Sequence, residues 1–134
     1  MAKTIVWIED DVDIIDPVIR PLERAGHRIL RLRLVQEALE NIELIRNSDL
    51  ILLDIILPSG DVSKEYGRYS GLELLQELKD EHGIETPVVV LSVVTNAEVY
   101  RRLRELGVKD IIRKPILPSK LKERVERVLE ELAE

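Results

Sequence analysis

The sequence LILLDIIL at residues 50–57 is apolar except for one aspartate, Asp54. An unbroken apolar run of this length is typical of a strand that is buried on both faces of a parallel sheet. A carboxylate is costly inside such a strand, so we expect Asp54 to lie at its carboxyl end, where Pro58 and Gly60 stop the strand. Ligands bind at that edge of an open α/β sheet. The stretch alone also allows a simple turn-forming aspartate.

Segments with strand and helix patterns alternate along the rest of the chain. Short apolar runs predict five strands, at residues 4–8, 27–32, 49–54, 88–91 and 108–112. Apolar residues at helical spacing predict five helices, at residues 13–25, 35–46, 71–81, 96–106 and 118–132. This alternation predicts an α/β fold, a doubly wound parallel sheet with helices on both faces. Arg28 and Arg31 favour an edge position for the second strand.

Local signals predict how several of these elements begin and end. Ser70 with Glu73, and Thr95 with Glu98, have the spacing of a capping box at the start of a helix. His27 follows a predicted helix end, and we expect it to be solvated.

The composition limits the possible functions. A chain of 134 residues with 45% hydrophobic residues is long enough for one domain with a core. Its net charge of −6 disfavours a nucleic acid as the default partner. The sequence has no cysteine, no targeting segment and no apolar run long enough to span a membrane, so the expected location is the cytoplasm.

Polar side chains follow four of the predicted strands at one edge of the sheet. They are Glu9 and Asp10, Asp54, Ser92 and Lys114. Three crowded carboxylates repel one another unless a cation joins them, and such an oxygen-lined site suits Mg²⁺. An aspartate can accept a phosphoryl group as an acyl phosphate, with a lysine and a hydroxyl on the phosphoryl oxygens. These residues therefore predict Mg²⁺-dependent phosphoryl transfer onto Asp54.

Single residues of this set also have plainer interpretations. Asp11 can replace Glu9 as one of the two acids after the first strand, although the five residues before Glu9 favour the Glu9 alternative. Taken alone, Ser92 is compatible with an ordinary strand-end hydroxyl and Lys114 with a surface charge. Only their joint occurrence favours the phosphoryl-transfer site.

Two other classes of protein fit the sequence less well. A Mg²⁺-dependent phosphatase with an aspartyl nucleophile needs a second acid two residues after the nucleophile, and here that residue is Ile56. A nucleotide- or flavin-binding domain needs a glycine-rich turn after the first strand. Residues 9–12 are acidic and contain no glycine, so this turn would repel a phosphate.

Four motifs, in this order, resemble those of the receiver domain of two-component response regulators, and the resemblance covers essentially the whole chain. They are the acidic pair in Ile8-Glu9-Asp10, the aspartate in LLDIILP at residues 52–58, the serine of VVVLS at residues 88–92, and the lysine of IIRKP at residues 111–115. The resemblance implies a flavodoxin-like fold with strand order 2-1-3-4-5 and one receiver domain over residues 1–134.

The resemblance also implies a role for each matched residue. Asp54 is the phosphoacceptor, Glu9 and Asp10 hold Mg²⁺ with Asp54 and the backbone carbonyl of Ile56, and Ser92 and Lys114 bind the phosphoryl oxygens. The bond between Lys114 and Pro115 is expected to be cis, a conformation that is essentially confined to bonds before proline.

The implied function is a signalling switch that takes a phosphoryl group from a sensor histidine kinase, without being an enzyme beyond its own phosphoryl transfer and slow autodephosphorylation. The expected output is contact with a downstream protein through helix 96–106, strand 108–112 and helix 118–132, with no direct nucleic-acid or membrane partner. We expect a monomer or weak homodimer. Because the chain ends after helix 118–132, it is predicted to be a stand-alone receiver, although an excised domain would look the same.

Three features depart from the usual pattern of the family. Ile111 stands where an aromatic residue is usual, and Val93 stands where a small residue is usual. The segment 59–70 contains an insertion of about nine residues, a lid or docking element in one interpretation and a tolerated surface loop in the other. These departures keep open an alternative function, a protein-binding adaptor with little or no phosphorylation.

Overall fold

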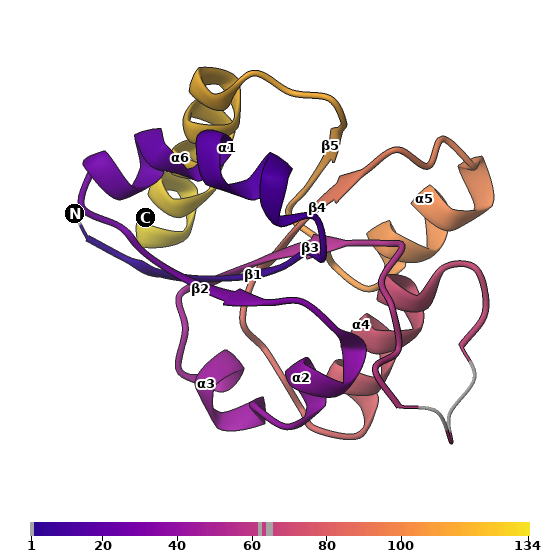
Figure 1. The fold of residues 1–134 in the computed structure, drawn as a ribbon. Helices are drawn as coiled ribbons and strands as arrows, with labels where there is room; N and C mark the ends of the chain where they lie inside the picture. Colours follow the sequence, from indigo (N-terminus) through magenta and orange to yellow (C-terminus); the bar gives the residue numbers. More distant parts are fainter. Residues whose placement is uncertain (1, 62, 64–65) are drawn as a thin grey trace.

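Five parallel strands form one sheet in the order β2-β1-β3-β4-β5 (Figure 1). The computed structural model describes residues 2–61, 63 and 66–134, with residues 12–15 described as helix backbone only. The strands are β1 (Thr4–Ile8), β2 (Arg28–Leu32), β3 (Leu50–Asp54), β4 (Val88–Ser92) and β5 (Asp110–Arg113). The predicted parallel sheet and strand order are confirmed, and β2 with its two arginines is an edge strand.

Helices cover both faces of the sheet (Figure 1). One face carries α1 (Val12–Arg24) and α6 (Pro118–Ala133), and the other carries α2 (Val35–Leu39), α3 (Ile42–Arg46), α4 (Ser70–Asp80) and α5 (Ala97–Glu105). None of the helices in the described part of the chain has the length and apolarity needed to cross a membrane. The described chain has six helices instead of the five predicted, because the segment 35–46 is divided in two.

Asn41 divides the helix that was predicted over residues 35–46. Its side-chain Nδ2 donates a hydrogen bond to the backbone oxygen of Glu37 at 2.7 Å. Its backbone leaves the helical region, with φ −125° and ψ 39°. A short polar side chain that bonds to nearby backbone competes with the helix in this way. Apolar periodicity continues across Asn41, so it does not reveal the break.

Strand β3 explains why residues 50–53 are apolar at every position. Every residue of the strand is buried. Leu50 and Leu52 join the core under α1 and α6, whereas Ile51 and Leu53 join the core on the opposite face. Alternate side chains of a strand point to opposite faces, so a strand buried on both faces needs apolar residues at every position. Only Asp54, at the carboxyl end, departs from this pattern.

Neither predicted capping box forms. Helix α5 is capped by Asn96, whose Oδ1 accepts hydrogen bonds from Glu98 N at 2.8 Å and Val99 N at 3.2 Å, so the cap lies one residue after Thr95. In the other pair, Ser70 is already the first residue of α4. The Glu73 carboxylate accepts a hydrogen bond from Gly67 N instead of from the residue before the helix.

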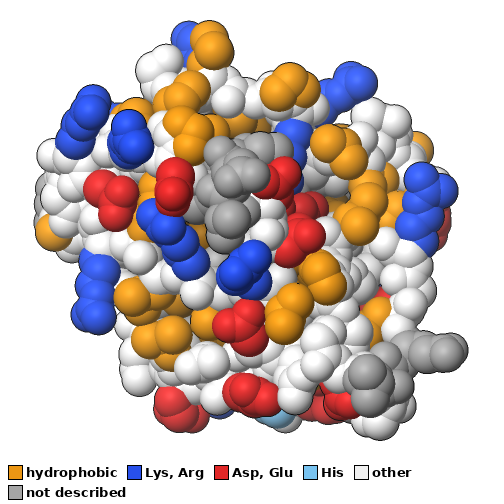
Figure 2. Space-filling view, viewed as in Figure 1, with side chains coloured by type: hydrophobic (Ala, Val, Ile, Leu, Met, Phe, Trp, Pro, Cys, Tyr) orange, Lys and Arg blue, Asp and Glu red, His pale blue; other side chains and the backbone are white. Residues whose placement is uncertain are grey.

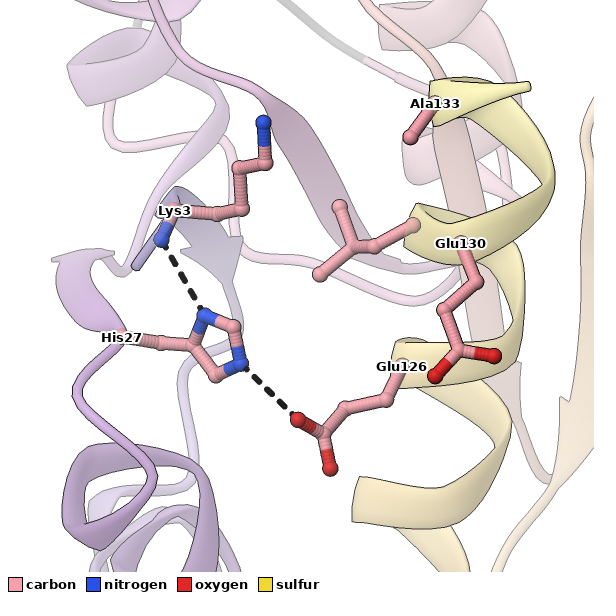
Figure 3. Close-up of a pocket in the computed structure, with 6 residues that line it drawn as sticks. Lys3, His27, Glu126, Glu130 and Ala133 are labelled. Carbon is pink, nitrogen blue, oxygen red and sulfur yellow. Dashed lines mark hydrogen bonds and ion pairs between the residues drawn. The ribbon is translucent and has the colours of Figure 1, made fainter. Parts of the chain in front are cut away.

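His27 is buried, which makes the prediction of a solvated side chain wrong. Its Nδ1 accepts a hydrogen bond from Lys3 N at 3.2 Å, and its Nε2 lies 3.3 Å from Glu126 Oε2 on α6 (Figure 3). Hydrogen bonds from Lys122 and His27 hold the pKa of Glu126 below its usual value. The ring lines a cavity of about 210 Å³ with Lys3, Glu126, Leu129, Glu130 and Ala133. His27 therefore joins the start of β1 to α6.

Replacing His27 by alanine is expected to lower the free energy of unfolding by about 1–3 kcal/mol, because the Lys3 amide loses its acceptor and Glu126 loses its partner. Urea denaturation followed by circular dichroism measures the difference. His82→Ala is the matched control, since the half-buried His82 side chain is expected to contribute less than about 0.5 kcal/mol. Equal stabilities of the two variants would contradict the structural role of His27.

Candidate functional site

The carboxyl ends of the strands bring the predicted polar residues together. Ile8 of β1 pairs with Leu53 of β3, so the next residues on the two strands, Glu9 and Asp54, lie side by side. In Figure 2 acidic side chains (red) gather near the middle of the face, where the carboxyl ends of β1 and β3 lie in Figure 1. In a parallel sheet the carboxyl ends of all strands lie at one edge, which explains why the residues after β1 and β3 lie close together.

Lys114 joins the two buried carboxylates. Its Nζ donates to Asp54 Oδ2 at 3.1 Å and also to Glu9 Oε2. The side chains of Glu9, Asp54 and Lys114 are only 2%, 10% and 14% exposed. Hydrogen bonds between charged groups in such a poorly solvated site are stronger than in water. The three side chains form a preassembled group that we call the Glu9–Asp54–Lys114 triad.

The pKa values of Glu9 and Lys114 reflect burial and crowding. Burial, and then the neighbouring Asp54 carboxylate, raise the pKa of Glu9 to about 7, although the hydrogen bond from Lys114 acts in the opposite direction. For Lys114, burial alone would lower the pKa, but the hydrogen bond to Glu9 and the charge of Asp54 outweigh burial and raise it. The site therefore has more negative charge than the single ammonium group balances.

The acidic cluster fits a divalent cation. Carboxylate oxygens of Glu9, Asp10 and Asp54 lie within 4.8 Å of one another. Oxygen ligands of this kind are those that Mg²⁺ prefers, and a cation among them would relieve their mutual repulsion. Among the described residues this cluster includes Glu9 and not Asp11, whose backbone N–H donates to Glu9 Oε1 at 3.3 Å. The geometry favours the Glu9–Asp10 pair over the alternative with Asp11.

The other predicted site residues lie beside the triad. Ser92 ends β4 and is buried, and its Oγ accepts a hydrogen bond from Val94 N at 2.8 Å. Its backbone oxygen accepts from Lys114 N at 2.9 Å, which ties the lysine to the neighbouring strand. The Lys114–Pro115 bond is cis, as predicted. Val93 is 61% exposed, so its side chain points mainly to solvent.

Ile56 lies in the turn after β3, and its backbone N–H donates to Asp54 Oδ1 at 3.1 Å. This hydrogen bond holds one carboxylate oxygen of Asp54, while Lys114 holds the other. The assignment of the Ile56 carbonyl as a metal ligand stays a prediction.

Gly71 is a site residue that the sequence did not reveal. Its N–H donates to Ile55 O at 2.7 Å. A Cβ at this position would lie 2.0 Å from the carbonyl oxygen of Asp54 and 2.6 Å from the Cα of Ile55. The first turn of α4 therefore packs directly on the backbone of the acidic strand end. The only sequence signal was a glycine at the start of an apolar helix, which does not say what the helix touches.

The segment 59–70 lies partly outside the described residues, at positions 62, 64 and 65. Its start is joined to α2, where Gln36 N donates to Ser59 O at 2.9 Å. Tyr66 packs against the core on the α2–α5 face. Burial, and then the charge of Glu77, raise the pKa of Tyr66. The segment thus contacts the fold at Ser59 and Tyr66, and its role as a lid or docking element stays a prediction.

Known proteins match this chain over nearly its whole length. The response regulator receiver domain family matches residues 5–126. The phosphate regulon transcriptional regulatory protein PhoB of Pseudomonas aeruginosa is 32% identical over 96% of this chain and 52% of its own length. The receiver domain protein (CheY-like) of Methanospirillum hungatei is 25% identical, with a TM-score of 0.77 over 98% of this chain and 96% of its own.

The chain also matches one part of a longer protein. NtrX of Brucella abortus is 35% identical, with a TM-score of 0.77 over 98% of this chain but 28% of its own. The chain likewise spans about half the length of the curated relatives it matches, as with PhoB of Escherichia coli, at 54%. The match over residues 5–126 includes every residue of the candidate site, so this chain belongs to the family of response regulator receiver domains.

Proposed function

We propose that this chain is a phosphorylation-dependent signalling switch in which Asp54 accepts a phosphoryl group from a sensor histidine kinase in a Mg²⁺-dependent reaction. The observation that carries the proposal is the buried Glu9–Asp54–Lys114 triad with Asp10 within reach of the same cation. In this proposal residues 1–134 are a single receiver domain, with 59–70 as an extended loop insertion.

The side chains of the site suit this chemistry. An oxygen of the Asp54 carboxylate attacks the phosphorus of a phosphohistidine, the P–N bond breaks, and the imidazole leaves with the electron pair. Mg²⁺ held by Glu9, Asp10, Asp54 and the Ile56 carbonyl would neutralise charge on the phosphoryl oxygens. Lys114 already donates to the Asp54 carboxylate. Its ammonium group is therefore close enough to donate to an oxygen of a phosphoryl group on Asp54.

Ser92 completes the proposed acceptor site. It ends the strand next to β3, where Asp54 pairs with Leu91, so its hydroxyl lies on the same edge as the acceptor. Its oxygen now accepts from the Val94 N–H, and we propose that after transfer the hydroxyl moves toward the phosphoryl group and donates to one of its oxygens. This movement would weaken the hydrogen bond from Val94, change the backbone after β4 and transmit the phosphorylation to α5.

The proposed partners are a sensor histidine kinase and a downstream protein. We place the output contact on α5, β5 and α6, with no direct nucleic-acid or membrane partner and with a monomer or weak homodimer as the working unit. The curated relatives that match are about twice as long as this chain, so a stand-alone receiver is also a proposal. A cytoplasmic location suits this function, because the phosphoryl group of a histidine kinase comes from ATP.

Phosphorylation by a small donor tests the proposal. Incubation with acetyl phosphate and Mg²⁺ is expected to add one phosphoryl group to the protein, and the same incubation with EDTA is expected to add none, because the carboxylates then repel the donor. Intact-protein mass spectrometry measures the adduct. Borohydride reduction followed by peptide mapping is expected to place it at Asp54. The absence of an adduct, with Mg²⁺ binding shown separately by fluorescence of the single tryptophan, would support the adaptor function instead.

A further inference from the structure

Ser70 makes two hydrogen bonds to the backbone of one residue in the turn after Asp54. Its Oγ accepts a hydrogen bond from Leu57 N at 2.7 Å and donates one to Leu57 O at 2.6 Å. Ser70 is 3% exposed and Leu57 is 6% exposed, so water does not compete for these groups. We call this pair the Ser70–Leu57 clamp. A capping role for Ser70, which its sequence spacing predicted, would not use these contacts.

The clamp fixes the direction of the Ile56 carbonyl. In a trans peptide the C=O of one residue and the N–H of the next lie in one plane and point in opposite directions. The only cis bond in the described chain is Lys114–Pro115, so the peptide between Ile56 and Leu57 is trans. Because Ser70 Oγ holds the Leu57 N–H, the Ile56 oxygen must point away from Ser70.

The preceding peptide plane is fixed in the same way. Its carbonyl, on Ile55, accepts from Gly71 N at 2.7 Å, and its N–H, on Ile56, donates to Asp54 Oδ1 at 3.1 Å. Two consecutive peptide planes are therefore held by groups outside the turn. Ser70, the first residue of α4, binds the peptide between Ile56 and Leu57, and Gly71, the second, binds the peptide between Ile55 and Ile56.

We propose that Ser70 is a positioning residue for Mg²⁺: by holding the Leu57 N–H it keeps the backbone carbonyl of Ile56 turned away from α4 and available to a cation that Glu9, Asp10 and Asp54 would bind. This inference rests on the proposed function, in which that carbonyl is a ligand. Groups that orient a metal ligand typically change metal affinity by about 10–100-fold when they are removed. Ser70 does not touch the reacting atoms, so its effect is on the affinity for Mg²⁺ and not on the transfer step at saturating Mg²⁺.

The test compares Ser70→Ala with the natural protein in three measurements. A Mg²⁺ titration followed by Trp7 fluorescence is expected to show about tenfold weaker binding, since the turn then loses its hold on the Ile56 carbonyl. The rate of phosphorylation by acetyl phosphate at saturating Mg²⁺ is expected to stay within about twofold. Amide hydrogen exchange without metal is expected to speed up at Leu57, because its N–H loses its acceptor.

Ser63→Ala is the matched control. Ser63 is an exposed serine in the same segment, and its hydroxyl donates to Asp61 Oδ1. Its removal is expected to leave the affinity for Mg²⁺ and the exchange at Leu57 unchanged. Ser70→Cys is the second variant in case Ser70→Ala does not fold, because a thiol is similar in size and accepts a hydrogen bond only weakly. It is expected to bind Mg²⁺ several-fold more weakly than the natural protein.

The outcomes separate the inference from the proposed function. Unchanged affinity for Mg²⁺ in a folded Ser70→Ala or Ser70→Cys variant would overturn the positioning role and leave the phosphoacceptor intact. A natural protein that neither binds Mg²⁺ nor takes a phosphoryl group would overturn the proposed function, and the inference would fall with it. Faster exchange at Leu57 together with weaker Mg²⁺ binding is the result that supports Ser70 as the positioning residue.

Discussion

Asp54→Asn is expected to reduce phosphorylation by acetyl phosphate to background. The asparagine amide keeps the shape of the side chain but is not a nucleophile, and it removes a negative charge from the cation site. We expect no transfer to the neighbouring acids, because Lys114 holds Glu9 and we propose that Glu9 and Asp10 bind the metal. Intact-protein mass spectrometry after incubation with Mg²⁺ and the donor measures the loss.

The same substitution at an exposed position gives the control for this loss. Asp80, at the last residue of α4, is exposed, so Asp80→Asn is expected to be phosphorylated as fully as the natural protein. The Asp54→Asn variant itself is expected to fold, because Lys114 keeps its ion pair with Glu9. A cooperative urea transition checks this. An adduct on Asp54→Asn at the level of the natural protein would mean that another side chain is the acceptor.

The sequence revealed those site residues whose place depends only on the topology of the sheet. Glu9, Asp54, Ser92 and Lys114 each follow or end a strand, and parallel strands bring such ends to one edge whatever the details of packing. The fold was predictable for a similar reason. A run that is apolar at every position, such as residues 50–53 of β3, is compatible with few places other than the centre of a covered parallel sheet.

The sequence did not reveal contacts in which one side chain meets a particular group far away in the sequence. His27 contacts Glu126, which is 99 residues away, and Ser70 binds Leu57 across the segment 59–70. Periodicity describes which face of an element is buried, and it contains no information on such partners. The capping-box spacing at Ser70 was present but misleading, because the hydroxyl binds the turn after β3 instead of the start of its own helix.

Gly71→Ala is expected to lower the free energy of unfolding by about 2–3 kcal/mol and to slow phosphorylation about tenfold. The added Cβ would lie 2.0 Å from the backbone carbonyl oxygen of Asp54, so α4 and the end of β3 must move apart. The better helix propensity of alanine, about 1 kcal/mol, offsets only part of this cost. This movement would displace the backbone of Asp54, the proposed phosphoacceptor, so stability and reactivity are expected to decline together. Urea denaturation and the rate of adduct formation measure the two effects.

Gly67→Ala separates this local effect from a general effect of replacing a glycine. The nearest atoms to a Cβ at Gly67 would be those of the Glu73 carboxylate, at 3.6 Å, which is an ordinary contact. We therefore expect stability within about 0.5 kcal/mol of the natural protein and an unchanged rate. Loss of stability in Gly71→Ala with a normal rate would mean that the backbone relaxes on the α4 side only. A slower rate in folded Gly71→Ala would instead show that the backbone of Asp54 must stay in place for the carboxylate to react, because α4 packs directly on that backbone.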